Sequence, residues 1–276
     1  MTTYLNRISF FNAGFCRQFA WLAGRKSWGI VRFNAVFAYV EHPDRGAFLI
    51  DTGYGDQFWK ATSSFPQRLY RWVTPTRLSE QIHAANVLAS TGIDPMSIQG
   101  IFISHFHADH IAGLNHFPHT RLIYRDTPLR QMKQLTATQQ LHHGFLPSLI
   151  PEDMEERSLT IDESSFRIQG DLLGNLRCVD YWGDGSLYLV DLPGHALGHM
   201  GFLLNTPEQP TLYVVDACWE LEAMRSQRTL PILSRRFQHD YAAYLQTQMH
   251  LRELVRHRDM RLLACHCTET QRQVVR

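Results

Sequence analysis

The sequence lacks the features that mark disulfide-stapled, membrane-spanning or strongly basic proteins. Its five cysteines form an odd set without a framework spacing, which favours a reducing, cytoplasmic environment. No apolar run approaches the ~18 residues of a membrane span, and no secretory signal is recognisable near residue 1. Lys and Arg are spread along the chain at a net charge of +1, so a large nucleic-acid footprint is not expected. These absences leave a small molecule as the expected partner, without nucleic acid or membrane, for a monomer or a homodimer.

The chain carries enough apolar material for one large core, since 44% of its 276 residues are hydrophobic and 19% are charged. We therefore expect a single domain over residues 1–276. Two segments are expected to form lids or to line a pocket. Residues 1–32 are rich in aromatic side chains, and residues from about 125 to 165 include a polar stretch without clear periodicity.

Hydrophobic periodicity predicts short strands with helices between them. The polar turn at 42–45 joins the first two strands into a hairpin, and the whole order suggests two βα halves that share one core. The strands are expected at 33–40, 46–50, 100–103, 121–124, 187–192, 200–204, 212–215 and 262–264, and the helices at 76–90, 128–143 and 241–255.

One stretch, ISHFHADH at residues 103–110, has a composition that is rare for a turn after a buried strand. It contains three imidazoles and one carboxylate, from His105, His107, Asp109 and His110. Four such groups this close in sequence cannot all reach one ion. The stretch therefore predicts part of a metal site that other segments complete.

Three further candidate ligands also follow predicted strands. His195 comes after the strand at 187–192, Asp216 after the strand at 212–215, and His266 after the strand at 262–264. Each of them alone would more often be a core histidine or a turn residue. Because a fold brings strand ends together at one sheet edge, we expect all three to converge with the first cluster.

The first cluster divides between two ions. Residues two apart in an extended turn point the same way, so His105 and His107 can hold one ion, with His195 as its third imidazole. The chain then turns into a helix start, and Asp109 and His110 face a second position. His266 is expected to complete that second position.

The bridging position between the two ions is assigned to Asp216, because only a carboxylate has two oxygens suited to it. A ligand set of imidazoles and carboxylates without cysteine suits two divalent ions, with zinc as the expected metal and an open position for catalysis. Cys265 and Cys267 flank His266 in an extended chain, so we expect both to point away from it and to serve packing.

Two other polar residues are expected to support the site. Metal-bound histidines usually donate their second ring N–H to a carboxylate or carbonyl, and Asp51, at a strand end, is the candidate for that role. His199, in the stretch GHALGH, is interpreted as a structural residue.

These motifs together resemble the metallo-β-lactamase-fold hydrolases. The resemblance rests on residues 105–110, Gly194-His195, Asp216 and His266, and on LIDTG at residues 49–53. It implies an α/β fold: a four-layer αβ/βα sandwich of two mixed β-sheets flanked by helices, with a dinuclear site at one edge.

Within that superfamily the spacing is most similar to N-acyl-homoserine-lactone lactonases. This implies a metal-dependent hydrolase of ester or lactone bonds, acting by attack of a metal-bridging hydroxide, with Asp109 passing the proton to the leaving oxygen. Such lactonases often carry a tyrosine three residues after the bridging aspartate, where this chain has Trp219. A glyoxalase II-like thioesterase and a non-catalytic metal-containing binding or regulatory module are the alternatives.

Overall fold

Two mixed β-sheets lie face to face in the computed structural model, which describes residues 2–78 and 82–275. In the first sheet, β1 to β3 pair antiparallel, and β3, β5, β6 and β7 pair parallel. The strands of this sheet, from edge to edge, are β4 (Thr76–Arg77), β1 (Arg7–Phe19), β2 (Ile30–His42), β3 (Gly46–Ile50), β5 (Ile98–Phe102), β6 (Arg121–Arg125) and β7 (Ser158–Ile161).

The second sheet is antiparallel except for one parallel pair at its edge, β12 with β13. Its strands, in order, are β13 (Arg261–Leu263), β12 (Thr211–Tyr213), β11 (Met200–Leu204), β10 (Leu187–Asp191), β9 (Arg177–Asp180) and β8 (Arg167–Ile168).

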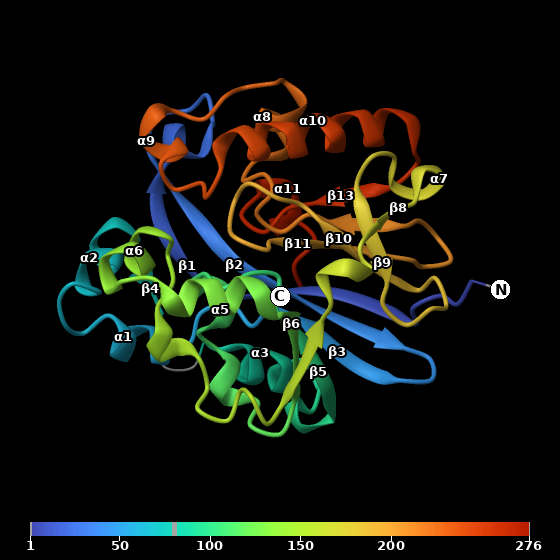
Figure 1. Cartoon of the computed structure of the whole chain (residues 1–276), viewed down its shortest axis with the longest axis horizontal. Helices are drawn as coiled ribbons and strands as arrows, with labels where there is room; N and C mark the ends of the chain where they lie inside the picture. Colours follow the sequence, from blue (N-terminus) through green and yellow to red (C-terminus); the bar gives the residue numbers. More distant parts are fainter. Residues whose placement is uncertain (1, 79–81, 276) are drawn as a thin grey trace.

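Helices cover the outer faces of the two sheets (Figure 1). The longest, α10, lies along the second sheet, and α3 and α5 lie on the side of the first. The helices are α1 (Gln57–Ala61), α2 (Arg68–Val73), α3 (Ala84–Ser90), α4 (Ala108–Ile111), α5 (Asp126–Gln134), α6 (Ala137–His142), α7 (Gly170–Leu173), α8 (Leu221–Arg225), α9 (Ile232–Arg235), α10 (Tyr241–His257) and α11 (Thr268–Gln271). None of the helices in the described ranges is long and apolar enough to cross a membrane.

The buried apolar side chains form three layers, which alternate with the sheets. Along β2, Phe37 belongs to the cluster under the first sheet's helices, while Val36 and Ala38 belong to the cluster between the sheets. This alternation follows from the two-residue period of a strand that is covered on both faces. Along β11, Phe202 faces the central layer and Leu203 faces α10. The four-layer sandwich expected from the sequence is confirmed.

Residues 7–19 lie within the range 1–32 that is expected to form a lid or to line a pocket. They form β1, which pairs with β2 over most of its length. Phe10 and Phe11 are buried on opposite faces of the sheet, in the central and outer clusters. Phe10 and Phe11 are therefore core residues in a stretch of strand covered on both faces, whereas Phe19 at the end of β1 is exposed. Such a strand lacks the polar alternation that would reveal it in the sequence.

Two of the expected helices also have different bounds. The helix expected at 128–143 is two helices, because Thr136 forms a capping box with Gln139 and starts α6 after a break. The helix expected at 76–90 begins only at Ala84, where His83 caps it, and its residues 79–81 lie outside the described part of the chain.

Arg125 joins the two sheets at the end of β6. Its guanidinium is 7% exposed and donates to Asp191 on β10 at 2.7 Å and to Glu163 at 2.7 Å. We expect Arg125→Met to lower the free energy of unfolding by about 1.5–3 kcal/mol, because the buried Asp191 carboxylate loses one of its two guanidinium partners and keeps only Arg177. Urea unfolding followed by circular dichroism measures this. Arg130→Met is the control, since Arg130 is largely exposed and pairs with Asp126 on its own helix; an equal loss in both variants would contradict the expectation.

Candidate metal centre

All seven candidate ligands lie at the carboxyl ends of strands, on one edge of the sandwich. This placement follows from the topology, since β3 and β5 run parallel in one sheet and β12 and β13 run parallel in the other. His105 and His107 lie in the loop after β5, Asp109 and His110 in α4, His195 in the loop after β10, Asp216 after β12, and His266 after β13.

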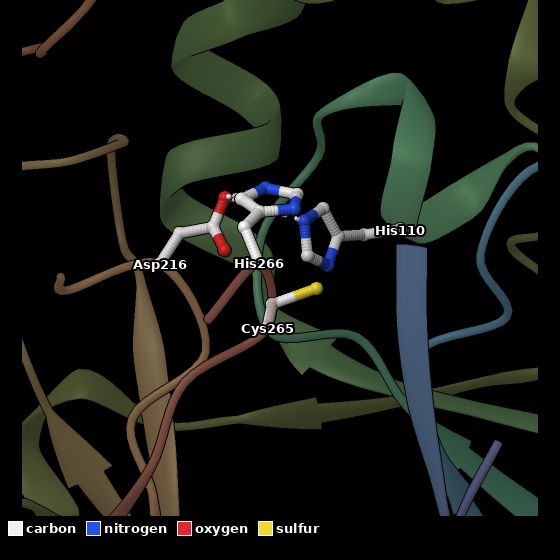
Figure 2. A group of neighbouring side chains, drawn as sticks. All are labelled: His110, Asp216, Cys265 and His266. Carbon is white, nitrogen blue, oxygen red and sulfur yellow. Dashed lines mark hydrogen bonds and ion pairs between the residues drawn. The ribbon is translucent and has the colours of Figure 1, made fainter. Parts of the chain in front are cut away.

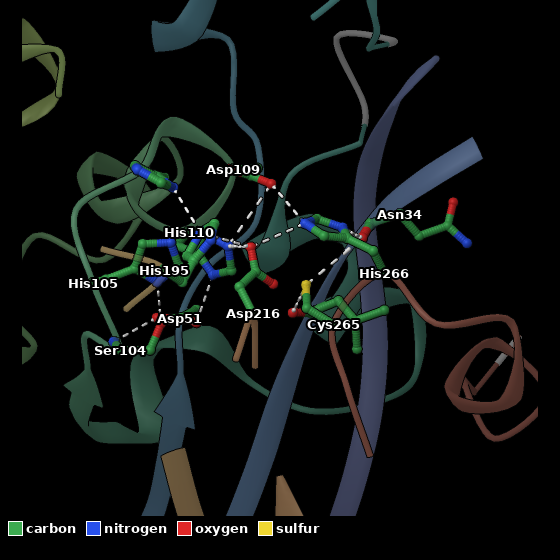
Figure 3. Close-up of polar contacts among 12 residues, drawn as sticks. Asn34, Asp51, Ser104, His105, Asp109, His110, His195, Asp216, Cys265 and His266 are labelled. Atoms are coloured by element: carbon green, nitrogen blue, oxygen red, sulfur yellow. Dashed lines mark hydrogen bonds and ion pairs between the residues drawn. The ribbon is translucent and has the colours of Figure 1, made fainter. Parts of the chain in front are cut away.

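The carboxylate of Asp216 lies at the centre of this group. Its Oδ2 atom is 3.3 Å from Nε2 of His195, 3.5 Å from Nε2 of His110 and 3.1 Å from Nε2 of His266. Asp216 is 2% exposed, so these contacts are shielded from water. One carboxylate oxygen is thus shared by imidazoles from both parts of the chain (Figure 3).

His105, His107 and His195 form the first group, and their ligand nitrogens lie within 4.8 Å of one another. Nε2 of His195 is 3.1 Å from Nδ1 of His107. Three imidazoles at this separation match the donor set of a catalytic zinc position with an open fourth site.

The second group consists of His110, Asp216, His266 and, unexpectedly, Cys265, with ligand atoms within 4.8 Å of one another (Figure 2). Oδ2 of Asp109 lies beside this group, 3.4 Å from Nε2 of His266 and 3.7 Å from Nε2 of His110. The first and second groups therefore meet at the carboxylate of Asp216.

Each of the five histidines gives its other ring nitrogen to an oxygen acceptor. Because these acceptors take one ring N–H, the remaining nitrogen faces the centre, where it can bind a metal ion once it carries no proton. The acceptors are Ser104 Oγ for His105 (3.0 Å), the His143 carbonyl for His107 (3.0 Å), the Asp51 carboxylate for His110 (2.7 Å), Gln238 Oε1 for His195 (2.9 Å) and the Asn34 carbonyl for His266 (2.9 Å).

Asp51 is fully buried and accepts three hydrogen bonds. Its Oδ1 accepts from the Ser104 backbone N–H at 2.8 Å, and its Oδ2 accepts from the Ser104 hydroxyl at 2.7 Å as well as from His110. The backbone φ of Asp51 is 62°, in the left-handed region that aspartate tolerates better than most residues. The supporting role expected for Asp51 rests on this contact with His110.

The backbone before Asp216 is strained, and His199 holds it. Val215 has a φ of 51°, which β-branched residues rarely adopt. The N–H of Asp216 donates to Nε2 of His199 at 3.2 Å, while Nδ1 of His199 donates to the Leu192 carbonyl at 3.1 Å. Burial lowers the pKa of His199 to about 4, so its ring stays neutral and can accept. His199 thus has the structural role expected of it.

Several buried polar atoms in the centre lack a hydrogen-bond partner among the described residues. Nε2 of His105, Nε2 of His110 and Oδ1 of Asp216 are such atoms. Burying a polar atom without a partner costs free energy. Divalent cations bound between these nitrogen and oxygen atoms would give each of them a partner. The donor set therefore suits the metal binding that this arrangement implies.

The pKa values of the histidines shift in opposite directions in the first and second groups. Burial lowers the pKa of His105 and His195 well below the usual value, which keeps both imidazoles neutral. Burial also opposes the charged form of His110 and His266, but neighbouring carboxylates raise their pKa well above the usual value. The pKa of Asp216 is lowered by these two imidazoles in spite of burial.

Sequence reasoning missed Cys265 as a neighbour of the centre. Strand alternation predicts that it points away from His266, yet its sulfur lies in the second group. The thiol donates to the Val36 carbonyl at 3.4 Å, which fixes its direction. The chain is already in a turn after β13, so the two-residue alternation no longer applies there. Gln238 and the carbonyls of Asn34 and His143 were missed as well, because no local pattern marks them.

Aromatic rings form one wall of the site. Phe33 stacks on His266 with ring centroids 4.7 Å apart. Trp219 packs edge-on against Phe33 at 5.8 Å and against His195 at 6.0 Å. The wall beside the metal ligands is therefore apolar.

The fold resembles that of solved structures, and part of the sequence matches a family model. Residues 31–125 match the family model of the metallo-beta-lactamase superfamily. A solved structure of an N-acyl homoserine lactone hydrolase, with the product N-hexanoyl-L-homoserine bound at its catalytic metal center, superposes with a TM-score of 0.72. The superposition covers 100% of this chain and 98% of that chain at 18% sequence identity. This is a metallo-β-lactamase-fold protein.

The proteins whose sequences resemble this chain carry several different names. This chain is 30% identical over 141 residues to the N-acyl homoserine lactonase AttM of Azorhizobium caulinodans, and the match covers 49% of this chain and 47% of that protein. It is 27% identical over 205 residues to the cytochrome P450 monooxygenase mpaDE of Penicillium brevicompactum, covering 64% of this chain. The match spans only 23% of the length of that relative.

Proposed function

We propose that the chain is a dinuclear metal-dependent hydrolase that cleaves an ester-type bond. A lactone of the N-acyl-homoserine-lactone type, or a related carboxylic ester, is the proposed substrate. His105, His107 and His195 would hold one ion, and Asp109, His110 and His266 the other, with Asp216 between them and zinc as the proposed metal. Two of the similar proteins, the N-acyl homoserine lactonase AttM and the N-acyl homoserine lactone hydrolase, support this assignment by their names.

The position of Asp216 carries the proposal. One of its oxygens lies 3.1–3.5 Å from imidazole nitrogens of three histidines that belong to both ligand groups. A carboxylate in that place can be shared by two ions a few Å apart. Divalent ions held there would supply an activated water at neutral pH and polarise a substrate carbonyl.

The chain's own residues orient the groups around the scissile bond and move its proton. Asp51 and Gln238 fix the rings of His110 and His195, so the ligand geometry is set before substrate arrives. Asp109 is partly open to the site and is proposed to pass a proton to the leaving oxygen. Phe33 and Trp219 exclude water from one side.

A substrate panel with Asp109→Asn tests the proposal. We expect turnover of lactones and aryl esters, and a loss of about a hundredfold or more on alkyl lactones in the variant. The loss should be much smaller on aryl esters, whose leaving groups need no proton. Metal content is measured in parallel, so that a proton-transfer defect is separated from loss of an ion.

Other outcomes of the panel assign a different function. Turnover limited to thioesters would favour a glyoxalase II-like activity. Protein that holds its metal and turns over no lactone, ester, thioester or β-lactam would support a binding or regulatory module instead. An equal loss on alkyl and aryl substrates at constant metal content would contradict the proton-transfer role of Asp109.

A further inference from the structure

Six large apolar side chains are exposed beside the metal centre, and we call them the apolar rim. Trp28 is 89% exposed, Ile232 73%, Ile30 65% and Trp72 59%. The rim consists of Phe19, Trp28, Ile30, Trp72, Val73 and Ile232. Isolated exposed apolar residues need no explanation, but exposed apolar side chains that gather on neighbouring segments mark an interaction surface.

Hydrogen bonds bring the three segments of the rim together. Phe19 and Ile30 are direct partners in the β1–β2 ladder. The side chain of Gln18 donates to the Val73 carbonyl at 2.8 Å, which attaches the end of α2 to β1. The Ser234 hydroxyl donates to the Leu22 carbonyl at 2.7 Å, which attaches α9 to the segment after β1. Figure 1 shows the ends of β1 and β2 beside α9.

The rim borders the metal centre through β2. Three residues after Ile30, the ring of Phe33 stacks on His266, and the next residue, Asn34, accepts the hydrogen bond of that histidine. Whatever covers the rim therefore lies near the part of β2 that contacts His266.

The three segments that carry the rim contain charged residues of one sign only, although Glu220 and Glu222 approach the segment after β1 from α8 and the residue before it. Residues 17–32, 65–77 and 230–238 contain nine of the 27 Lys and Arg residues and none of the 26 acidic residues. Arg25, one of the nine, pairs with the buried Glu220 from outside these segments. Arg17 and Arg32 face each other directly in the β1–β2 ladder, although like charges opposite one another destabilise a sheet. Since the whole chain carries a net charge of only +1, this cationic surplus is local.

We propose that the apolar rim docks the protein on an anionic lipid surface, together with the nine Lys and Arg residues of residues 17–32, 65–77 and 230–238, which we call its cationic border. Exposed tryptophans surrounded by Lys and Arg match the chemistry of the interface between lipid headgroups and acyl chains. A second copy of the chain fits less well, because a two-fold contact would bring two cationic borders together. This docking needs no membrane-spanning helix and does not depend on the proposed hydrolysis.

Vesicle co-sedimentation of the whole chain tests the docking. We expect binding to vesicles of equimolar phosphatidylcholine and phosphatidylglycerol, weakened by salt and at least about tenfold weaker on phosphatidylcholine alone. The double variants Trp28→Ser/Trp72→Ser and Arg17→Glu/Arg32→Glu should each lose about tenfold or more in affinity. Binding should also shift the tryptophan fluorescence of the wild type to shorter wavelength.

Matched controls lie on the second sheet and its covering helix. Ile168→Ser on β8 removes an apolar side chain that is 61% exposed, and Arg256→Glu on α10 reverses an exposed cation. Both should bind vesicles like the wild type. The docking is overturned if the wild type does not bind anionic vesicles, or if the controls lose as much as the rim variants. A dimer that Trp28→Ser/Trp72→Ser dissociates, or binding to poly-glutamate without vesicle binding, overturns it in favour of a protein partner.

Discussion

An Asp216→Asn variant is expected to hold fewer than two divalent ions per chain and to lose about a thousandfold or more in kcat/KM, if the chain is the proposed hydrolase. The amide cannot offer two anionic oxygens, and its N–H₂ group would face ring nitrogens that lie 3.1–3.5 Å from the native carboxylate oxygen. Both the bridging contact and the charge balance with His110 and His266 are lost.

Elemental analysis of purified protein and single-substrate kinetics measure the two parts of this prediction. The wild type should contain close to two transition-metal ions per chain. Asp171→Asn serves as the control, because Asp171 is exposed on α7 and far from the ligands in sequence and fold. A variant at position 216 that keeps two ions and wild-type rates would refute the shared-carboxylate proposal.

Replacement of Asp51 by alanine should destabilise the metal-free protein by about 3–5 kcal/mol. Three donors lose their acceptor in a fully buried place: the backbone N–H and hydroxyl of Ser104 and the ring N–H of His110. His110 also loses the contact that fixes its ring, so affinity for the second ion should fall by about 10–100-fold.

Chemical unfolding of the metal-free protein separates the stability effect from metal affinity, which is measured by titration of the folded protein. Asp44→Ala is a matched control that removes an exposed carboxylate from the β2–β3 hairpin. In Asp51→Asn the amide keeps one acceptor but places N–H₂ toward a donor, so we expect an intermediate loss. Unfolding curves that coincide for Asp51→Ala and the wild type would contradict the buried-network account.

Much of the candidate centre was predictable because its residues sit where strands end. His105 to His110, His195, Asp216 and His266 each follow an apolar run, and topology alone brings such positions to one edge. Whether these side chains hold metal stays a prediction. The four layers could be anticipated through the motif resemblance, whereas local periodicity revealed only the individual strands and helices.

The remaining features depend on packing that no local pattern encodes. β1 was expected to form a lid or to line a pocket, because aromatic residues on both of its faces look alike whether they are buried or mobile. Trp28 and Phe11 are both large and apolar, yet one is 89% exposed and the other fully buried. Cys265 approaches the centre because the chain turns after β13, and that turn is set by contacts with β2 from the other half of the chain.

The division of the ligands between the two sheets has a consequence for assembly. Four of the seven come from the half that contains β5, and three come from the half that contains β10, β12 and β13. Neither half alone can present the complete proposed ligand set, so we expect metal to bind only after both sheets have packed across the central apolar layer. Bound ions would then stabilise the packing of the two sheets against each other, and their loss would first weaken the contact between the two halves of the chain.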